Sequence, residues 1–351
     1  MGPLRLPESL ALRAVVQWGA FTRQQAIEAG LTSDEICRRL RCGQLTALRR
    51  GVYVRTEDIP DPETDPRGHH LLQATARWLV VDGDVAISHT SAAAVFGWRL
   101  LDGPPVEPQL TVARLPGTPP TKRRGLFEAS LPPSDRVSFG PEVVVTSPAR
   151  SLADCVRHLG RDAALVVADS ALASAVPRAD VLEVLGRCER WPGVLAARDV
   201  MLFADPRAES ALESLARQWF LEQGLPPPEL QARLHRDGRF LGRVDFFWPD
   251  VRTACEVDGR LKYEDAAPSP ERRPGQERRP GQERKANPLF AEKKREDMLR
   301  NAGAEVVRGY WSDGADRGAA LAGRLREAFE RGAARTDPPR YQVTTTPVLT
   351  A

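Results

Sequence analysis

The sequence has no long apolar runs, no paired cysteines and few lysines. Its apolar stretches span only a few of the 351 residues, which excludes a transmembrane helix, and its first residues predict no secretory signal. The five cysteines are odd in number, scattered and never in a CxxC pair, so we predict neither a zinc site nor a disulfide framework. We therefore expect a reduced, cytoplasmic setting and no membrane partner.

What the chain does contain is typical of a folded globular protein. Hydrophobic residues make up 42% and charged residues 28%, and 351 residues are enough for two or three domains. The net charge of +3 says little about partners, but its distribution is uneven. Residues 1–55 hold nine arginines against four acidic residues, whereas 56–70 hold five acidic residues and one arginine. This pattern predicts a small basic module that binds nucleic acid, followed by an acidic linker.

The basic head carries the helix signals of a three-helix module. An apolar stripe over 10–18 predicts the first helix, and capping boxes at Thr22–Gln25 and Thr32–Glu35 predict the second and third. Two strands are expected over 45–48 and 51–54. Three helices followed by a hairpin is the order of a winged helix-turn-helix, whose third helix enters the major groove of DNA.

Five arginines of the head are candidate DNA-binding residues. Arg38, Arg39 and Arg41 lie on the third predicted helix, where Ile36 and Leu40 face inward. The other two lie at the hairpin turn. A solvated arginine face on a small helical domain is the alternative, and we favour DNA binding. The candidates are Arg38, Arg39, Arg41, Arg49 and Arg50.

The middle of the chain predicts mixed helices and strands without a clear chemistry. His89 lies beside Thr90 and Ser91, and with Asp154 or Asp169 this suggests a hydrolase. We reject that interpretation because there is no nucleophile elbow and adjacency in sequence is not triad geometry. Ser88 or Thr90 is expected to cap a helix instead. Helices are predicted over 69–81, 90–97, 148–158 and 162–174, and strands near 109–113 and 143–146.

The last third predicts the element order helix, three strands, helix, strand. A helix is expected to begin at Asp205, with Pro206 at its first position. A hexapeptide repeated at 271–276 and 277–282 predicts a disordered insertion over 264–288, and 333–351 is expected to be a loose tail. The strands are predicted over 229–235, 240–248, 251–258 and 304–308, and the later helices over 289–302 and 314–331.

Carboxylates converge on one face of this predicted sheet. Residues two apart on a strand share a face, so Glu256 and Asp258 point one way and Cys255 and Val257 the other. Asp245 lies on the preceding strand, which we expect to pair with this one. Glu213 projects from the helix upstream and completes the group, and Glu209, one turn earlier, is an alternative for this role.

Such a group of carboxylates needs a neutralising partner because like charges repel. Asp245, Glu256 and Asp258 are candidate ligands of Mg²⁺ or Mn²⁺, whose bound water would attack a phosphodiester. Lys262 would stabilise the charge on the phosphate. The alternative is an amphipathic hairpin whose polar face simply meets solvent.

These residues resemble the PD-(D/E)XK nuclease fold, and most of all its very-short-patch-repair endonuclease-like (Vsr-like) branch. The resemblance covers about 205–330 without the insertion, and implies an αβββαβ sheet flanked by helices with catalytic Glu213, Asp245, Glu256, Asp258 and Lys262. One position departs from the pattern: the lysine expected two residues after the glutamate is Asp258, so Lys262 or Lys293 would have to replace it. If neither does, the domain binds DNA without cutting it.

The head is similar to the winged helix of abortive-infection type IV antitoxins (AbiEi). The similarity rests on residues 19–26, 30–32 and 48–53, with further segments at 88–93 and 146–154. It implies a DNA-binding repressor of a type IV toxin–antitoxin or phage-defence system, with a cognate toxin as partner. The nuclease-like last third departs from this family, which has no need of it.

We therefore predict a multidomain α+β protein that binds double-stranded DNA. Its parts are a winged helix (1–56), an acidic linker (57–68), a mixed α/β middle domain (69–200), a nuclease-like domain (205–332) and a tail. Mg²⁺-dependent cleavage of DNA directed by the head is the first hypothesis, and an antitoxin-like transcriptional regulator with an inactive nuclease-like domain is the second. A scaffold with 264–288 as a tethered arm is a third.

Overall fold

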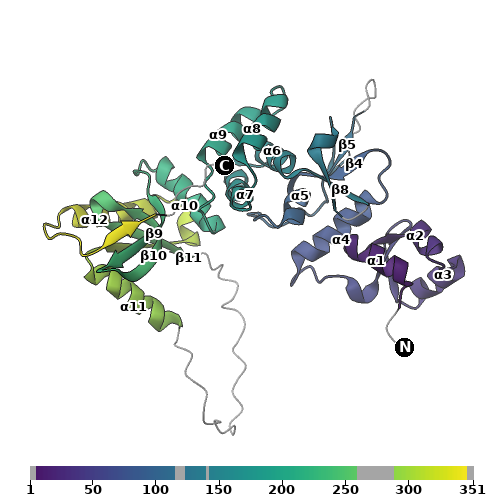
Figure 1. The fold of residues 1–351 in the computed structure, drawn as a ribbon, viewed down its shortest axis with the longest axis horizontal. Helices are drawn as coiled ribbons and strands as arrows, with labels where there is room; N and C mark the ends of the chain where they lie inside the picture. The colour runs from purple at the N-terminus through teal and green to yellow at the C-terminus, as the bar shows by residue number, and fades with distance from the viewer. Residues whose placement is uncertain (1–4, 115–122, 140–141, 259–287, 346–351) are drawn as a thin grey trace, which may run out of the picture. The chain divides into compact units, whose positions relative to one another are not determined.

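The computed structural model describes residues 5–114, 123–139, 142–258 and 288–345, with the backbone alone for 288–294. The fold is mixed α/β with three sheets among these residues, and the chain divides into two compact units (Figure 1). Unit 1 runs to Pro206 and unit 2 covers Arg207–Thr350. None of the helices in the described parts of the chain is long and apolar enough to cross a membrane. The predicted insertion 264–288 lies almost wholly outside the described residues.

The head of unit 1 contains the three predicted helices and a three-stranded sheet in the order β1-β3-β2. The capping box of Thr22 and Gln25 is confirmed. Thr32 also caps its helix, but the Glu35 side chain forms ion pairs with Arg39 and Arg38 instead of closing a second box. The elements are α1 (Glu8–Val16), β1 (Phe21–Thr22), α2 (Arg23–Glu28), α3 (Ser33–Arg41), β2 (Leu45–Arg49) and β3 (Val52–Arg55).

The head is not a separate body on an acidic linker, as the charge pattern predicted. Val52 and Val54 pack against Leu72 and Ala76 of α4 (Pro66–Trp78) in a shared apolar cluster. Glu142, from the middle region, accepts hydrogen bonds from Gln17 and Gln25 and pairs with Arg13. Head and middle regions therefore form one unit, because burying these apolar faces together removes both from water.

The middle of unit 1 is a five-stranded sheet, in the order β6-β5-β4-β8-β7, followed or interrupted by the helices α5 to α9. The helices and strands predicted here are present within a few residues of their expected bounds. The elements are β4 (Val85–Ile87), α5 (His89–Phe96), β5 (Leu110–Ala113), β6 (Leu126–Ala129), β7 (Arg136–Phe139), β8 (Val143–Thr146), α6 (Pro148–His158), α7 (Arg161–Ala173), α8 (Arg178–Arg187) and α9 (Val194–Phe203).

Unit 2 has the predicted order of helix, three strands, helix and strand around one sheet, β12-β11-β10-β9-β13. Neighbouring strands are antiparallel except β11 and β12, which are parallel. Apolar rings of α10 and α12 pack on one face of the sheet, and Leu299 of α11 packs on the other (Figure 1). The elements are α10 (Ala211–Glu222), β9 (Glu229–Arg236), β10 (Arg239–Trp248), β11 (Thr253–Asp258), α11 (Pro288–Asn301), β12 (Glu305–Tyr310) and α12 (Ala319–Ala333).

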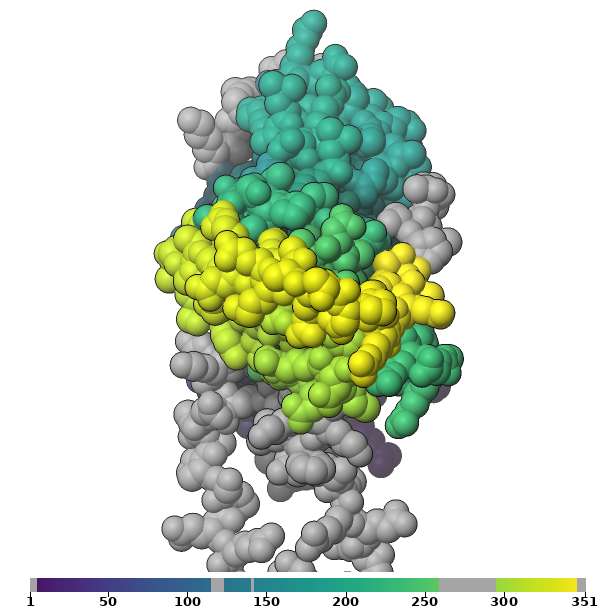
Figure 2. All heavy atoms as spheres, turned by 90° about the vertical axis from the view of Figure 1, so that its left-hand side faces the viewer, coloured from purple at the N-terminus to yellow at the C-terminus, as the bar shows by residue number. Residues whose placement is uncertain are grey.

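Two boundaries in unit 2 differ from the sequence prediction. Helix α10 begins after Ser210, whose side chain accepts a hydrogen bond from the Glu213 backbone at 3.1 Å, and not at Asp205. The tail is not wholly loose, because β13 (Gln342–Thr344) pairs with β9 at the sheet edge. Figure 2 shows the C-terminal part of unit 2, from α12 onward, in yellow on the face that it presents. The added strand covers backbone groups of β9 that an open edge would expose.

Candidate functional site

Asp245 and Glu256 face each other across two neighbouring strands. The pairing of β10 with β11 matches Phe246 with Cys255 and Phe247 with Ala254, which sets Asp245 opposite Glu256. Directly opposed residues of antiparallel strands share a face. The Val257 backbone donates to Asp245 Oδ2 at 2.9 Å and fixes this carboxylate against β11. The structure thus brings together two of the three predicted metal ligands.

Gln231, which the sequence did not reveal as a site residue, links Glu213 of α10 to Asp245. The side-chain amide of Gln231 donates to Glu213 Oε2 at 2.7 Å and is also hydrogen-bonded to Asp245. Gln231 has φ 52°, and it lies in a run of three buried residues that breaks the alternation of β9. No sequence pattern signals this left-handed backbone. A polar residue at the centre of a predicted strand is the one clue.

Burial makes the two acids of this group resist ionisation. Glu213 and Gln231 are 6% and 4% exposed. Burial, followed by the nearby charge of Asp245, raises the pKa of Glu213, and burial also raises the pKa of Asp245. Hydrogen bonds from Val257 and Gln231 lower the pKa of Asp245, but by less than burial raises it.

Glu256 is in contact with arginines that the sequence analysis did not single out. Arg295 of α11 donates to Glu256 Oε2 at 3.0 Å and to the Arg243 backbone carbonyl at 2.9 Å. The stem of Arg295 crosses Gly242, where a side chain would crowd it. Arg308, paired with Glu256 in the β11–β12 register, lies 3.8 Å from the same carboxylate. The cations beside the glutamate are therefore arginines of α11 and β12.

The other predicted residues have different surroundings. Asp258 ends β11 and is exposed. Glu209, the alternative to Glu213, is half-exposed and accepts from both terminal nitrogens of Arg243, at 2.7 and 2.6 Å, which leaves Glu213 as the buried acid. Lys262 lies outside the described residues, as does the side chain of Lys293.

The side chains present suit a divalent cation. Among the described residues no group of three or more His, Cys, Asp and Glu is arranged to hold a metal. The oxygens of Asp245, Glu256 and Glu213 are nevertheless the donors that Mg²⁺ and Mn²⁺ prefer. Gln231 Oε1 is buried and has no hydrogen-bond partner in the described part of the chain. Burial raises the pKa of Asp245 although Arg243 and Arg295 lie near it, as is expected of an acid taken out of water.

The five arginines of the head fall into two classes. Arg38, Arg41 and Arg50 are exposed, the first with 64% of its side chain accessible. Arg39 is 11% exposed and paired with Glu35, and Arg49 has its Nε buried. The three exposed arginines are accessible to a DNA phosphate backbone, whereas Arg39 and Arg49 are partly buried in the protein.

The Ser–His–Asp arrangement rejected from sequence is also not assembled in three dimensions. Ser88 Oγ lies 2.9 Å from His89 Nδ1, while His89 Nε2 has no hydrogen-bond partner in the described residues. Ser91 contacts a different histidine, His70, at 2.8 Å. Ser88 stands at the N-cap of α5 without capping it. Gln109 instead accepts from the Thr90 backbone.

No known family profile matches the chain. Two relatives from Mycobacterium tuberculosis, the uncharacterized proteins MT2308 (strain CDC 1551) and Rv2248 (strain H37Rv), are 41% identical over 116 residues. The match spans 33% of this chain and 43% of each relative's length. Among solved structures, the RV2827C protein of M. tuberculosis is 17% identical with a TM-score of 0.31, over 61% of this chain and 79% of that one.

Proposed function

We propose that unit 2 is a PD-(D/E)XK-like nuclease domain that cleaves DNA with Mg²⁺ or Mn²⁺. The observation that carries the proposal is the pairing of Asp245 with Glu256 across two strands, together with the Gln231 amide that links Glu213 to Asp245. The order α10-β9-β10-β11-α11-β12, with β12 parallel to β11, supports the αβββαβ assignment. A solvated hairpin face does not explain why these acids are buried.

Each side chain has a role that follows from its surroundings. Asp245 and Glu256 would hold the cation, with Glu213 as an outer ligand and Gln231 orienting the two acids that it bridges. When bound, the metal supplies a water of lowered pKa and a positive charge near the phosphate. Arg295, already against Glu256, takes the place that the family pattern gives to lysine.

The head would direct the protein to double-stranded DNA as a winged helix. The order α1-β1-α2-α3-β2-β3 and the exposed arginines of α3 and the β2–β3 turn support this. Helix α3 would lie in the major groove and Arg50 would contact the backbone. Binding should therefore weaken with salt, since arginine contacts to phosphate release counterions.

The test is a cleavage assay on supercoiled plasmid and linear duplex with Mg²⁺, Mn²⁺ or EDTA. We expect metal-dependent nicking that disappears in Asp245→Asn and Glu256→Gln. Glu209→Gln is the matched control, because Glu209 lies one turn from Glu213 but is exposed and paired with Arg243. Nicking that survives in all three variants comes from a contaminant and contradicts the proposal.

A second candidate is an antitoxin-like regulator whose nuclease-like domain no longer cuts. The presence of Asp258 where the pattern has lysine favours it. Such a protein would bind one operator, and a cognate toxin would be its partner. A folded protein that shifts DNA but nicks it under none of these metal conditions would support this candidate over the nuclease.

DNA binding by the head is tested with a matched pair of arginines. Arg38→Ala should weaken binding and lower the slope of log K against log salt by about one. Arg190→Ala removes the same charge from an exposed position elsewhere in unit 1 and should change neither. Equal effects of the two substitutions would remove α3 from the interface.

A further inference from the structure

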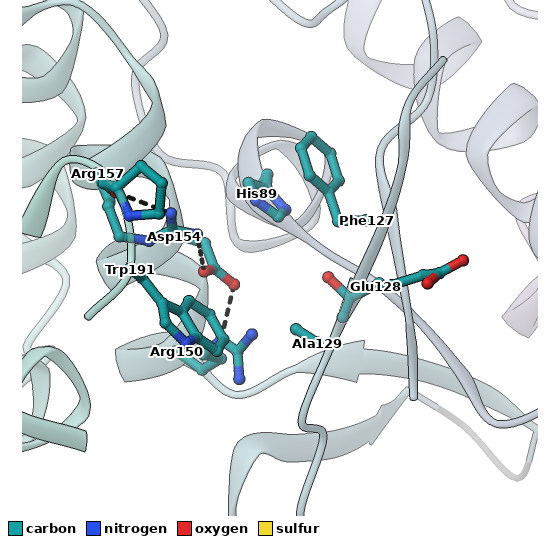
Figure 3. Close-up of a pocket in the computed structure, with 10 residues that line it drawn as sticks. His89, Phe127, Glu128, Ala129, Arg150, Asp154, Arg157 and Trp191 are labelled. Carbon is teal, nitrogen blue, oxygen red and sulfur yellow. Dashed lines mark hydrogen bonds and ion pairs between the residues drawn. The ribbon is translucent and has the colours of Figure 1, made fainter. Parts of the chain in front are cut away.

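Unit 1 contains a cavity of about 310 Å³ that the proposed nuclease and DNA-binding roles do not use. Figure 3 shows His89, Phe127 and Ala129 on one side of it and Arg150, Asp154 and Trp191 on the other. The residues come from α5, β6, α6 and the segment between α8 and α9. A volume near the low end of ligand pockets, about 300–1,000 Å³, suits a small molecule.

Two buried polar atoms of the cavity lining lack a hydrogen-bond partner among the described residues. They are Nε2 of His89, a residue 2% exposed, and Oγ1 of Thr111, which is fully buried. Buried polar groups are satisfied by protein or ordered solvent in the great majority of cases. Two such atoms lining one cavity are groups with which a polar ligand could form hydrogen bonds.

The backbone holds His89 in this position. Its φ of 52° is uncommon for a residue other than glycine, and such outliers cluster at functional sites. Gln109 fixes the strained turn by accepting from both the backbone and the hydroxyl of Thr90, at 2.9 and 2.7 Å. The ring of His89 stacks on Phe127 with 3.8 Å between centroids, so a flat apolar surface lies beside the unpaired nitrogen.

The opposite side of the cavity combines an aromatic ring with groups that donate and accept hydrogen bonds. Arg150 and Arg157 lie over the Trp191 ring, 5.0 and 4.9 Å from its centroid, and both contact Asp154. Arg150 also donates to Asp135 at 2.9 Å, so carboxylates of the protein already balance these guanidinium groups, while the carboxylate of Glu128 points away from the cavity (Figure 3). A phosphate would have to compete with Asp154 and Asp135 for these guanidinium groups, which disfavours a charged ligand.

We propose that this cavity binds a nucleobase-type heterocycle: a flat, uncharged ring with donors and acceptors along its edge. The rings of His89, Phe127 and Trp191 form part of the wall, and such a wall suits a flat ligand. An imidazole and a hydroxyl, each of which donates or accepts, match a mixed heterocycle edge. The ring has two sources, a free nucleoside or an unstacked base of a single strand whose phosphates stay outside.

The test titrates the full-length protein calorimetrically with the four deoxynucleosides and with short single strands of the same bases. Three variants alter the cavity. Thr111→Val removes the unpaired hydroxyl and Ala129→Met fills space. His89→Asn removes the imidazole at a position where asparagine tolerates the backbone. Ser138→Ala, at an exposed position of the same sheet, is the control.

We expect saturable binding that each cavity variant weakens at least tenfold and the control leaves unchanged. Binding of nucleosides identifies a free ligand, and binding of single strands alone identifies an unstacked base. Thr111→Val should fold with an unchanged or higher melting temperature, because it removes a buried unpaired hydroxyl. Absence of saturable binding of every nucleoside and strand, or binding that the cavity variants leave intact, would overturn the proposal.

Discussion

The two units each bury a cluster of charged groups, but they balance the charges in opposite ways. In unit 1, Asp154 accepts from Arg150 at 2.7 Å and from Arg157 at 3.2 Å. Burial alone would raise its pKa, but charges led by those of His89 and Arg150 lower it. In unit 2, Glu213 is buried beside a second acid, and burial and that neighbour both raise its pKa.

The difference indicates in which of the two clusters the protein itself balances the buried charges. Buried ions that are matched and hydrogen-bonded serve the fold, since removing one partner leaves an uncompensated charge. An acid buried beside another acid, as Glu213 is beside Asp245, lowers stability, and such an arrangement is typical of functional sites. Unit 1 therefore carries a structural ionic centre beside its cavity, whereas unit 2 carries a group of acids suited to a cation. Four predictions test this contrast, in order of the effect expected from each single residue, the largest first.

Asp154→Asn should destabilise unit 1 the most. It leaves the guanidinium of Arg150, 2% exposed, without one of its two carboxylates, at a cost of about 3–5 kcal/mol. Hydrogen exchange in peptides of α6 measures the loss, and peptides of β10 should not change. The control is Asp199→Asn, which breaks an exposed pair with Arg161 and should cost less than about 1 kcal/mol. A cost for Asp154→Asn as small as the control's would contradict a structural role.

Acid should weaken unit 1 through two buried histidines. Burial lowers the pKa of His70 and of His89 from 6.5 to about 4. Between these values the unfolded chain binds protons that the folded chain does not, so stability present above pH 6.5 is lost as the pH falls towards 4. Each histidine should contribute roughly 3 kcal/mol to this loss.

The measurement is the free energy of unfolding of unit 1 between pH 7.5 and pH 4. His70→Gln removes one titrating group, and its side chain can still reach the Ser91 hydroxyl that His70 contacts at 2.8 Å. The variant should lose about half as much stability over this range as the original protein. A slope that His70→Gln leaves unchanged would show that other groups cause the acid sensitivity.

Strand register is the part of the unit 2 site that the sequence could predict. Alternation assigned Glu256 and Cys255 to opposite faces, and the antiparallel pairing then follows from the short turn between the two strands. Gln231 could not be found this way, because its left-handed backbone breaks the alternation on which the method depends. Arg295 could not be found either, since it lies 39 residues from Glu256 and only the packing of α11 joins them.

Long-range contacts also account for what was missed in unit 1. The sequence predicted Asp205 as the cap of α10, but the structure uses Asp205 differently: its backbone donates to the buried Asp169 at 2.7 Å. Strands β6 and β7 lie in a segment dense in proline and glycine, which conceals strand periodicity. Local patterns thus predicted most elements, and contacts between distant residues set their ends and the cavity.

Glu213→Gln should stabilise unit 2 at pH 7, which is the opposite of the effect at Asp154. It removes a buried charge that faces Asp245, and its amide can donate to the unpaired Oε1 of Gln231. We expect a gain of about 0.5–2 kcal/mol, as is common when a strained functional site is relieved. Because the raised pKa means that protonation favours the fold, the gain should vanish as acid protonates Glu213.

Thermal unfolding of unit 2 at pH 7 and pH 4, with and without Mg²⁺, measures this effect. Mg²⁺ should raise the melting temperature of the original protein, because a ligand that binds only the folded state stabilises it. Mg²⁺ should raise the melting temperature of the Glu213→Gln variant by a smaller amount. A variant that is less stable than the original at pH 7 would show that Glu213 is satisfied by its present partners.

Glu209→Gln, one helical turn away, should have the smallest effect of the four. Its ion pair with Arg243 has good bidentate geometry, but both side chains are about half exposed, so water and salt screen it. The loss should stay below about 1 kcal/mol and shrink further at high salt. Thermal unfolding at two ionic strengths measures this loss. Glu213→Gln is measured in parallel, so that two acids near the N-terminus of α10 are compared under identical conditions. If the two substitutions change the stability at pH 7 in opposite directions, the destabilisation comes from the buried Glu213. If both raise the stability equally, it comes from the crowding of negative charge at the N-terminus of α10 as a whole.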